Sequence, residues 1–134
     1  MKKIELNKET YAILVDRESL KEGAEWFGEP FEPLQAQRVN AKEGKVYKAH
    51  FHILNPRIIK QTQESFVVIS GKIAVDIYDL GMNLLGCLEA GPGEVILSYR
   101  GGHGIRVLED SIFYEFKAGQ YTYVSEDKEF FNGI

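Results

Sequence analysis

Cysteine, long apolar runs and clustered positive charge are all scarce in this chain. The single cysteine, Cys87, excludes a disulfide within the chain and fits a reducing cytoplasm. No window approaches the roughly 18 apolar residues of a membrane span, and residues 1–6 lack the apolar stretch of a signal peptide, so we expect a cytoplasmic protein that does not associate with a membrane. The net charge is −4 with both signs interspersed, and the lack of a basic face argues against nucleic-acid binding.

The apolar content and the length are nevertheless sufficient for a core. With 134 residues, 44% of them hydrophobic, the chain can form one domain without disulfides or other cross-links. We therefore expect a single domain over residues 1–134. Cys87 lies beside Leu84, Leu85 and Leu88, which favours a buried structural thiol over a nucleophile.

Short β-prone segments separated by Gly, Pro, Asn and Asp turns dominate the sequence, and no long helical periodicity competes with them. This pattern predicts an all-β sandwich or barrel. Residues 26–33 contain two prolines and two phenylalanines and are expected to form an irregular connection. The expected strands cover residues 11–15, 34–39, 46–52, 64–70, 73–78, 84–88, 94–98, 105–108 and 112–117.

Histidine occurs three times, as His50, His52 and His103. His50 and His52 are two residues apart, so on a strand both imidazoles point to one face and Phe51 points to the other. Neutral imidazole is the commonest protein ligand for transition metals. A pair of strand histidines can equally form a polar face in contact with solvent, so the pair alone does not decide between the two interpretations.

The residues around the histidine pair resemble the first motif of the cupin superfamily, which has a glycine, five residues, HxH, a spacer, a glutamate, six residues and a glycine. Here Gly44 precedes His50 and His52 at that spacing, and Glu64 precedes Gly71 at that spacing. The spacer between the histidine pair and the glutamate has eleven residues instead of the usual three or four. Glu64 is alternatively a solvated carboxylate at the start of a strand.

The second cupin motif, a glycine, five residues, PxG, two residues and a histidine, is matched in a shortened form. Gly93 is followed by five residues and then by 99–103, which end in His103 and lack the proline and one residue. The resemblance covers about residues 34–117. Within the superfamily, the Thr-Gln-Glu run at 62–64 and the Gly-Gly-His-Gly run at 101–104 are similar to those of small single-domain cupins from bacterial surface-polysaccharide gene sets.

The resemblance implies a cupin-type double-stranded β-helix, or jelly-roll barrel, whose core spans about residues 34–117, with residues 1–33 and 118–134 packed on it. It also implies one divalent metal ion, of Fe, Mn, Ni, Co or Zn, with two coordination positions open to water or substrate. The implied metal ligands converge at one end of the barrel and are His50, His52, Glu64 and His103.

Polar residues near the motifs are candidates for binding a substrate, although each is alternatively an ordinary surface group. An arginine makes bidentate pairs with anionic groups. Strand alternation places Glu64 and Phe66 on one face and Gln63 on the other, so Gln63 and Glu64 cannot both point inward. The substrate-binding candidates are Arg57, Gln63, Tyr99 and Arg106.

Only the resemblance indicates a substrate class, which is a carbohydrate or a nucleotide sugar. An isomerase or epimerase would use the cation to stabilise an enediolate. A non-catalytic sugar-binding or sensor cupin and a metal-dependent dioxygenase are alternatives, so whether the protein is an enzyme stays open. Small cupins usually pair, and we expect a homodimer; apolar residues on both faces of 65–69 and the Phe130–Phe131 pair favour it.

Overall fold

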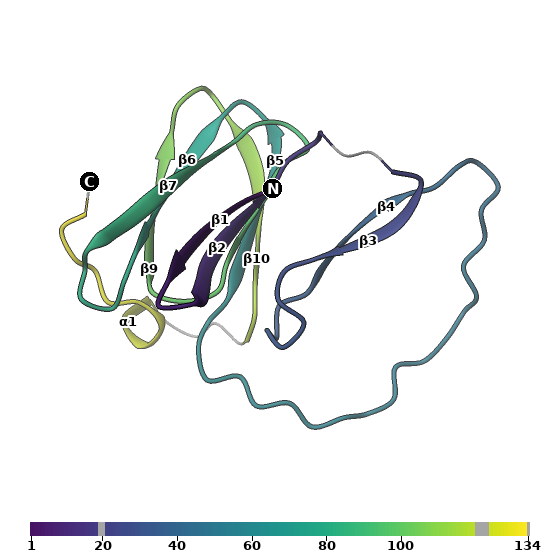
Figure 1. Ribbon diagram of the computed structural model, residues 1–134, viewed down its shortest axis with the longest axis horizontal. Helices are drawn as coiled ribbons and strands as arrows, with labels where there is room; N and C mark the ends of the chain where they lie inside the picture. The colour runs from purple at the N-terminus through teal and green to yellow at the C-terminus, as the bar shows by residue number, and fades with distance from the viewer. Residues whose placement is uncertain (19–20, 120–123, 134) are drawn as a thin grey trace.

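The computed structural model describes residues 1–18, 21–119 and 124–133 and is all-β apart from one short helix (Figure 1). This confirms the fold class expected from the turn-separated segments. The described elements are β1 (Lys2–Leu6), β2 (Glu9–Val15), β3 (Gly23–Phe27), β4 (Ala36–Asn40), β5 (Glu64–Ser70), β6 (Ile73–Tyr78), β7 (Leu84–Ala90), β8 (Val95–Ser98), β9 (Gly102–Val107), β10 (Ile112–Lys117) and α1 (Val124–Asp127).

Two antiparallel sheets enclose the main core. One sheet has the strand order β1-β2-β8-β5-β10 and the other has the order β7-β6-β9. Side chains alternate between the two faces of each strand. The space between the sheets is therefore filled by fully buried side chains such as Phe66 and Val68 of β5 and Val75 and Ile77 of β6. Within the described residues the two sheets form a sandwich and do not close into the barrel that we expected.

A hairpin of β3 and β4 forms a third layer. It packs over the outer face of the five-stranded sheet, where Phe27 joins a second buried cluster with Ile13, Leu97 and Tyr99. The expectation of an irregular connection at 26–33 was therefore wrong at its start, because Trp26 and Phe27 end β3 in register with β4.

Residues 41–62, which we call the arm, leave β4 and return to β5 as an extended excursion that lies away from both sheets (Figure 1). All of them are exposed, and no strand is formed within them. The strand expected at 46–52 was therefore wrong for the single chain. The alternation of that segment suits a strand, but a strand exists only where a neighbour accepts its backbone hydrogen bonds, and the segment is paired with none of the described strands.

Cys87 was expected to be buried but is exposed. Leu88 and Ala90 of β7 face the core, and alternation turns Cys87 outward. Its Sγ lies 3.5 Å from Nη2 of Arg106, and burial together with the neighbouring Asp76 raises the pKa of the Cys87 thiol. Among the described residues, no helix has the length and apolar character to cross a membrane.

Candidate functional site

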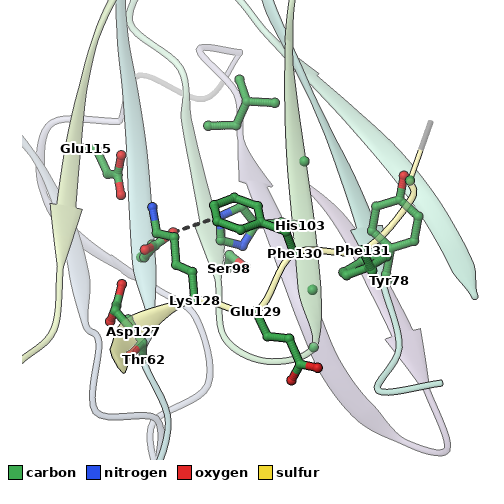
Figure 2. A pocket seen from close by; sticks show the side chains of 16 residues that line it. Thr62, Tyr78, Ser98, His103, Glu115, Asp127, Lys128, Glu129, Phe130 and Phe131 are labelled. Carbon is green, nitrogen blue, oxygen red and sulfur yellow. Dashed lines mark ion pairs between the residues drawn. The ribbon is translucent and has the colours of Figure 1, made fainter. Parts of the chain in front are cut away.

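A pocket of about 550 Å³ opens between the two sheets at one end of the sandwich (Figure 2). The five-stranded sheet contributes Glu64, Ser98 and Glu115 from three of its strands, and β9 contributes His103 from the opposite sheet. The C-terminal segment 127–133 forms the remaining wall. The pocket therefore draws its lining from both sheets and from the end of the chain.

Glu64 and His103 face each other across the pocket. The Oε2 atom of Glu64 lies 2.8 Å from Nε2 of His103, and the Glu64 side chain is only 5% exposed. The pair is an ion-pair contact, and Oε2 has no hydrogen bond of regular geometry among the described residues. A buried carboxylate oxygen without a donor is unusual, because leaving such a group unsatisfied costs on the order of 1–3 kcal/mol or more.

The local sequence explains how the two side chains meet. Glu64 begins β5 and shares its inward face with Phe66, and β8 holds it in register opposite Ser98. His103 lies on β9 opposite Ile77 of β6. The His103 ring packs edge-on against Phe66, with ring centroids 5.5 Å apart. Phe66 therefore positions the imidazole beside the carboxylate two residues before it.

Charges around Glu64 decide its protonation. Burial acts to raise the pKa of the Glu64 carboxyl, but contact with His103 and the positive charges of His103, Lys128 and Lys117 together hold this pKa below its usual value. Glu64 is thus a carboxylate at neutral pH, available to a cation.

The charged side chains in the rest of the lining are mostly acidic. Glu115, Asp127 and Glu129 line the pocket with Glu64, whereas Lys128 is the lysine among the lining residues. Asp127 forms an ion pair with Lys117 of β10. Clefts lined by one sign of charge concentrate ions of the opposite sign, so this pocket favours a cation over a free anion.

The C-terminal segment is fixed over the pocket by aromatic packing. The rings of Tyr78 and Phe131 meet edge to face with centroids 5.1 Å apart. A Cβ at Gly102 would lie 2.9 Å from the Phe131 ring, so glycine permits this approach. The C-terminal segment therefore forms one wall of the pocket on its own chain, with Phe131 packed against Tyr78 (Figure 2).

The structure brings two of the four expected metal ligands together. His50 and His52 lie on the arm and are exposed, with their rings 5.2 Å apart and Nδ1 of His50 2.9 Å from the Lys48 carbonyl oxygen. Within 1–18, 21–119 and 124–133, no group of three or more His, Cys, Asp or Glu side chains is arranged to hold a metal. One chain therefore presents the Glu64–His103 half of the expected ligand set.

Gln63 lies on the opposite face of its strand from Glu64, as alternation requires. Its Oε1 accepts a 2.8 Å hydrogen bond from the Leu34 backbone, and its Nε2 donates a 2.6 Å bond to Glu32. Tyr99 is fully buried in the outer cluster beneath the hairpin, and burial, with the charges of Glu32 and Glu29, raises the pKa of its hydroxyl to about 12. Both residues hold the third layer and lie outside the pocket lining.

The two arginine candidates also lie outside the pocket lining. Arg106 follows inward-facing Ile105 and therefore points outward, where Nε and Nη2 bind the carboxylate of buried Asp76 at 2.7 and 2.8 Å. Arg57 is exposed on the arm. Gln63, Tyr99 and Arg106 therefore do not line this pocket, and their role in substrate binding stays a prediction. Proximity in sequence to the motifs does not determine the face of the strand.

Sequence reasoning missed several lining residues. Glu115 lies two residues after Phe113 of β10 and therefore on the same face of the strand. Because Phe113 packs on the core, this spacing was the available signal for an inward carboxylate. Tyr78 and Ser98 end β6 and β8, and only the strand register brings them to the same end of the sandwich.

No match to this chain was found among protein-family models, curated proteins or solved structures. The functional interpretation therefore depends on the geometry and charge of the pocket.

Proposed function

We propose that this protein is a cupin-type jelly roll that binds one divalent metal ion, held in part by Glu64 and His103, and acts on or binds a carbohydrate in the pocket above it. The observation that carries the proposal is the buried Oε2 of Glu64, which has no aligned donor and lies 2.8 Å from Nε2 of His103. The expected ligands His50 and His52 would complete the set.

The donor pair fits a metal in chemistry and in spacing. Imidazole nitrogen and carboxylate oxygen are the ligands that Fe, Mn, Co, Ni and Zn share. With bond lengths of about 2.1 Å, two donors at neighbouring coordination positions lie roughly 3 Å apart, close to the spacing seen here. The acidic lining adds a favourable potential for a cation.

When bound, the cation would polarise a substrate carbonyl and stabilise negative charge on its oxygen. The chain's own residues supply the rest of the environment. Glu115 and Glu129 present carboxylate oxygens that accept hydrogen bonds from sugar hydroxyls, and Phe130 offers an exposed aromatic ring against which the apolar face of a sugar can pack. The segment that carries Phe131 restricts the access of water from its side.

The charge of the lining also ranks the substrates. Four carboxylates repel a free diphosphate, so a nucleotide sugar requires the bound cation, whereas an uncharged sugar does not have to overcome this repulsion. A reducing sugar is therefore our first choice of substrate, with isomerisation or epimerisation next to its carbonyl as the reaction.

Metal content after loading tests the proposal. The purified protein is incubated separately with Fe(II), Mn(II), Co(II), Ni(II) and Zn(II), desalted and analysed by mass spectrometry of the elements. We expect about one ion per chain for at least one metal, and at least a tenfold weaker affinity in His103→Ala and Glu64→Gln. Glu109→Gln makes the same chemical change at an exposed position outside the lining and serves as the control. Equal metal binding by His103→Ala and the control would exclude the site.

Thermal-shift measurements test the substrate class. Glucose, fructose and uridine diphosphate glucose are added to metal-free and metal-loaded protein. A sugar that binds the native state raises the melting temperature by mass action. We expect uridine diphosphate glucose to act only on the loaded form; an equal shift without metal contradicts the electrostatic argument.

A further inference from the structure

The metal site proposed above is incomplete within one chain, and the missing half is on the arm. His50 and His52 are exposed there, whereas Glu64 and His103 lie in the pocket. We propose that the arm of one copy adds as a strand to the free edge of β9 in a second copy and thereby brings its His50 and His52 to the partner's Glu64–His103 pair. This inference rests on the proposed function for its chemistry, and on the following features for its geometry.

The edge of β9 is open. In the described sheets β9 pairs with β6 on one side and with no strand on the other. An edge strand presents unpaired N–H and C=O groups that bind an added strand. His103 and Ile105 point inward from this edge, and Gly104 between them has nothing within 4 Å of the place where a Cβ would stand. The outer face of β9 is therefore uncovered at this position.

The arm has the properties of a strand without a sheet. Residues 46–52 alternate so that the two imidazoles share one face, which on the β9 edge would be the inward face that carries His103. Phe51 is 99% exposed, and large apolar side chains along the rest of the arm are also exposed. Contiguous apolar surface beyond a few hundred Å² marks an interaction site. The exposed arm residues are Val46, Tyr47, Phe51, Ile53, Leu54, Ile58 and Ile59.

The amount of surface fits a stable pair of copies. An aromatic side chain buries about 150–250 Å², so Tyr47 and Phe51 with five aliphatic side chains approach the roughly 800 Å² per partner of a specific interface. Each copy carries both the arm and the open edge, so a two-fold arrangement satisfies both at once.

A second exposed apolar patch adds surface on which another copy can pack. Tyr114 and Phe116 of β10 and Ile69 of β5 lie on the outer face of the five-stranded sheet, each about half exposed, beside the face that the β3–β4 hairpin covers. The arm leaves from that hairpin and extends away from its own β9 (Figure 1). In the single chain the arm does not pair with its own β9, and a second copy supplies the edge.

Mixing two defective chains tests the exchange. His103→Ala keeps the arm histidines and loses the pocket imidazole, whereas His50→Ala/His52→Ala does the reverse. The two chains carry different affinity tags, are refolded together, and the mixed dimer is isolated through both tags. If the arm crosses between copies, the mixed dimer contains one intact site and binds about half the metal of wild type, although neither variant alone binds a stoichiometric amount. If wild type binds metal but the mixed dimer does not, the exchange of arms is excluded, and the proposed metal site is not affected by this result.

Mass in solution tests the exchange without reference to metal. Light scattering on wild type should give twice the 15.2 kDa of the chain. Phe51→Asp should shift the protein to the monomer, since this exposed residue has no role within its own chain's core, whereas Leu80→Asp, at an 88% exposed position in the β6–β7 turn, should leave the dimer intact. If wild type binds no metal, the proposed function fails, and the mass in solution alone decides whether the arms are exchanged. A dimeric wild type with a monomeric Phe51→Asp variant supports the exchange. A Phe51→Asp variant that stays dimeric, or a monomeric wild type, overturns it.

Discussion

Replacing Gly101 with alanine perturbs the turn that delivers His103 to the pocket. Gly101 has a φ of 74°, in the left-handed region, where an alanine costs roughly 1–2 kcal/mol. A Cβ there would also lie 2.1 Å from the backbone oxygen of Tyr78 and 2.9 Å from the Tyr11 ring. Because β6 and β9 are paired at Tyr78 and Gly102, this oxygen cannot move without separating the two strands.

The size of the effect follows from these two contributions. Forcing an extra carbon into a packed region costs typically 1–3 kcal/mol, so together with the backbone strain we expect Gly101→Ala to lower the free energy of unfolding by about 2–5 kcal/mol. Urea unfolding followed by circular dichroism measures the difference. On a domain stable by about 5–15 kcal/mol, this loss is large and easily resolved.

Gly104→Ala is the matched control on the other side of His103. Its Cβ would have nothing within 4 Å, and Gly104 does not have a positive φ, so we expect a change of less than about 1 kcal/mol. A loss in Gly101→Ala that is no greater than in Gly104→Ala would refute the argument that the Tyr78 carbonyl and the left-handed turn fix the start of β9.

Three further changes test other parts of the structure. Tyr99→Phe removes a buried hydroxyl that has no partner among the described residues, so urea unfolding should show no loss, and up to about 1–2 kcal/mol of gain; a clear destabilisation would contradict this. Hydrogen bonds from Arg106 lower the pKa of Asp76, so their stabilisation is complete above the ordinary pKa of 3.8 and disappears as pH falls through the lower folded value. Asp76→Asn should therefore lose about 1–3 kcal/mol at pH 7 and approach wild type near pH 2, and a difference independent of pH would exclude that cause. Phe66→Ala should cost about 3–5 kcal/mol in the same assay, since Phe66 is fully buried, and a loss below about 1 kcal/mol would be inconsistent with its place in the core.

Several strands were predictable from alternation along the chain, whereas β1 and β3 were not expected although both pair within the chain. The expected 64–70, 73–78 and 112–117 coincide with β5, β6 and β10. The prediction that Gln63 and Glu64 point to opposite faces of the sheet was also correct, because alternation along one strand is a local property. Local rules thus recovered both the strands and the inward carboxylate.

The failures have one physical cause, which is that the sequence does not specify the neighbouring strand. The segment 46–52 has the pattern of a strand, yet it pairs with none of the described strands of its own chain. Cys87 was expected to be buried although its neighbour Leu88 occupies the inward position, and the substrate-binding candidate Arg106 points outward beside the inward Ile105. A shift of one residue in register exchanges the two faces, so candidates selected by distance along the sequence could not be placed.

Pulsed electron paramagnetic resonance on the Cu(II)-loaded protein tests whether the pocket holds the metal, because it detects the imidazoles bound to the ion. Cu(II) binds imidazole more strongly than the other divalent metals do. The account predicts coupling to more than one imidazole in wild type, a single imidazole in His50→Ala/His52→Ala, and loss of one imidazole in His103→Ala. An identical spectrum for wild type and His103→Ala would contradict it, because the ion would then lie outside the pocket that Glu64 and His103 form.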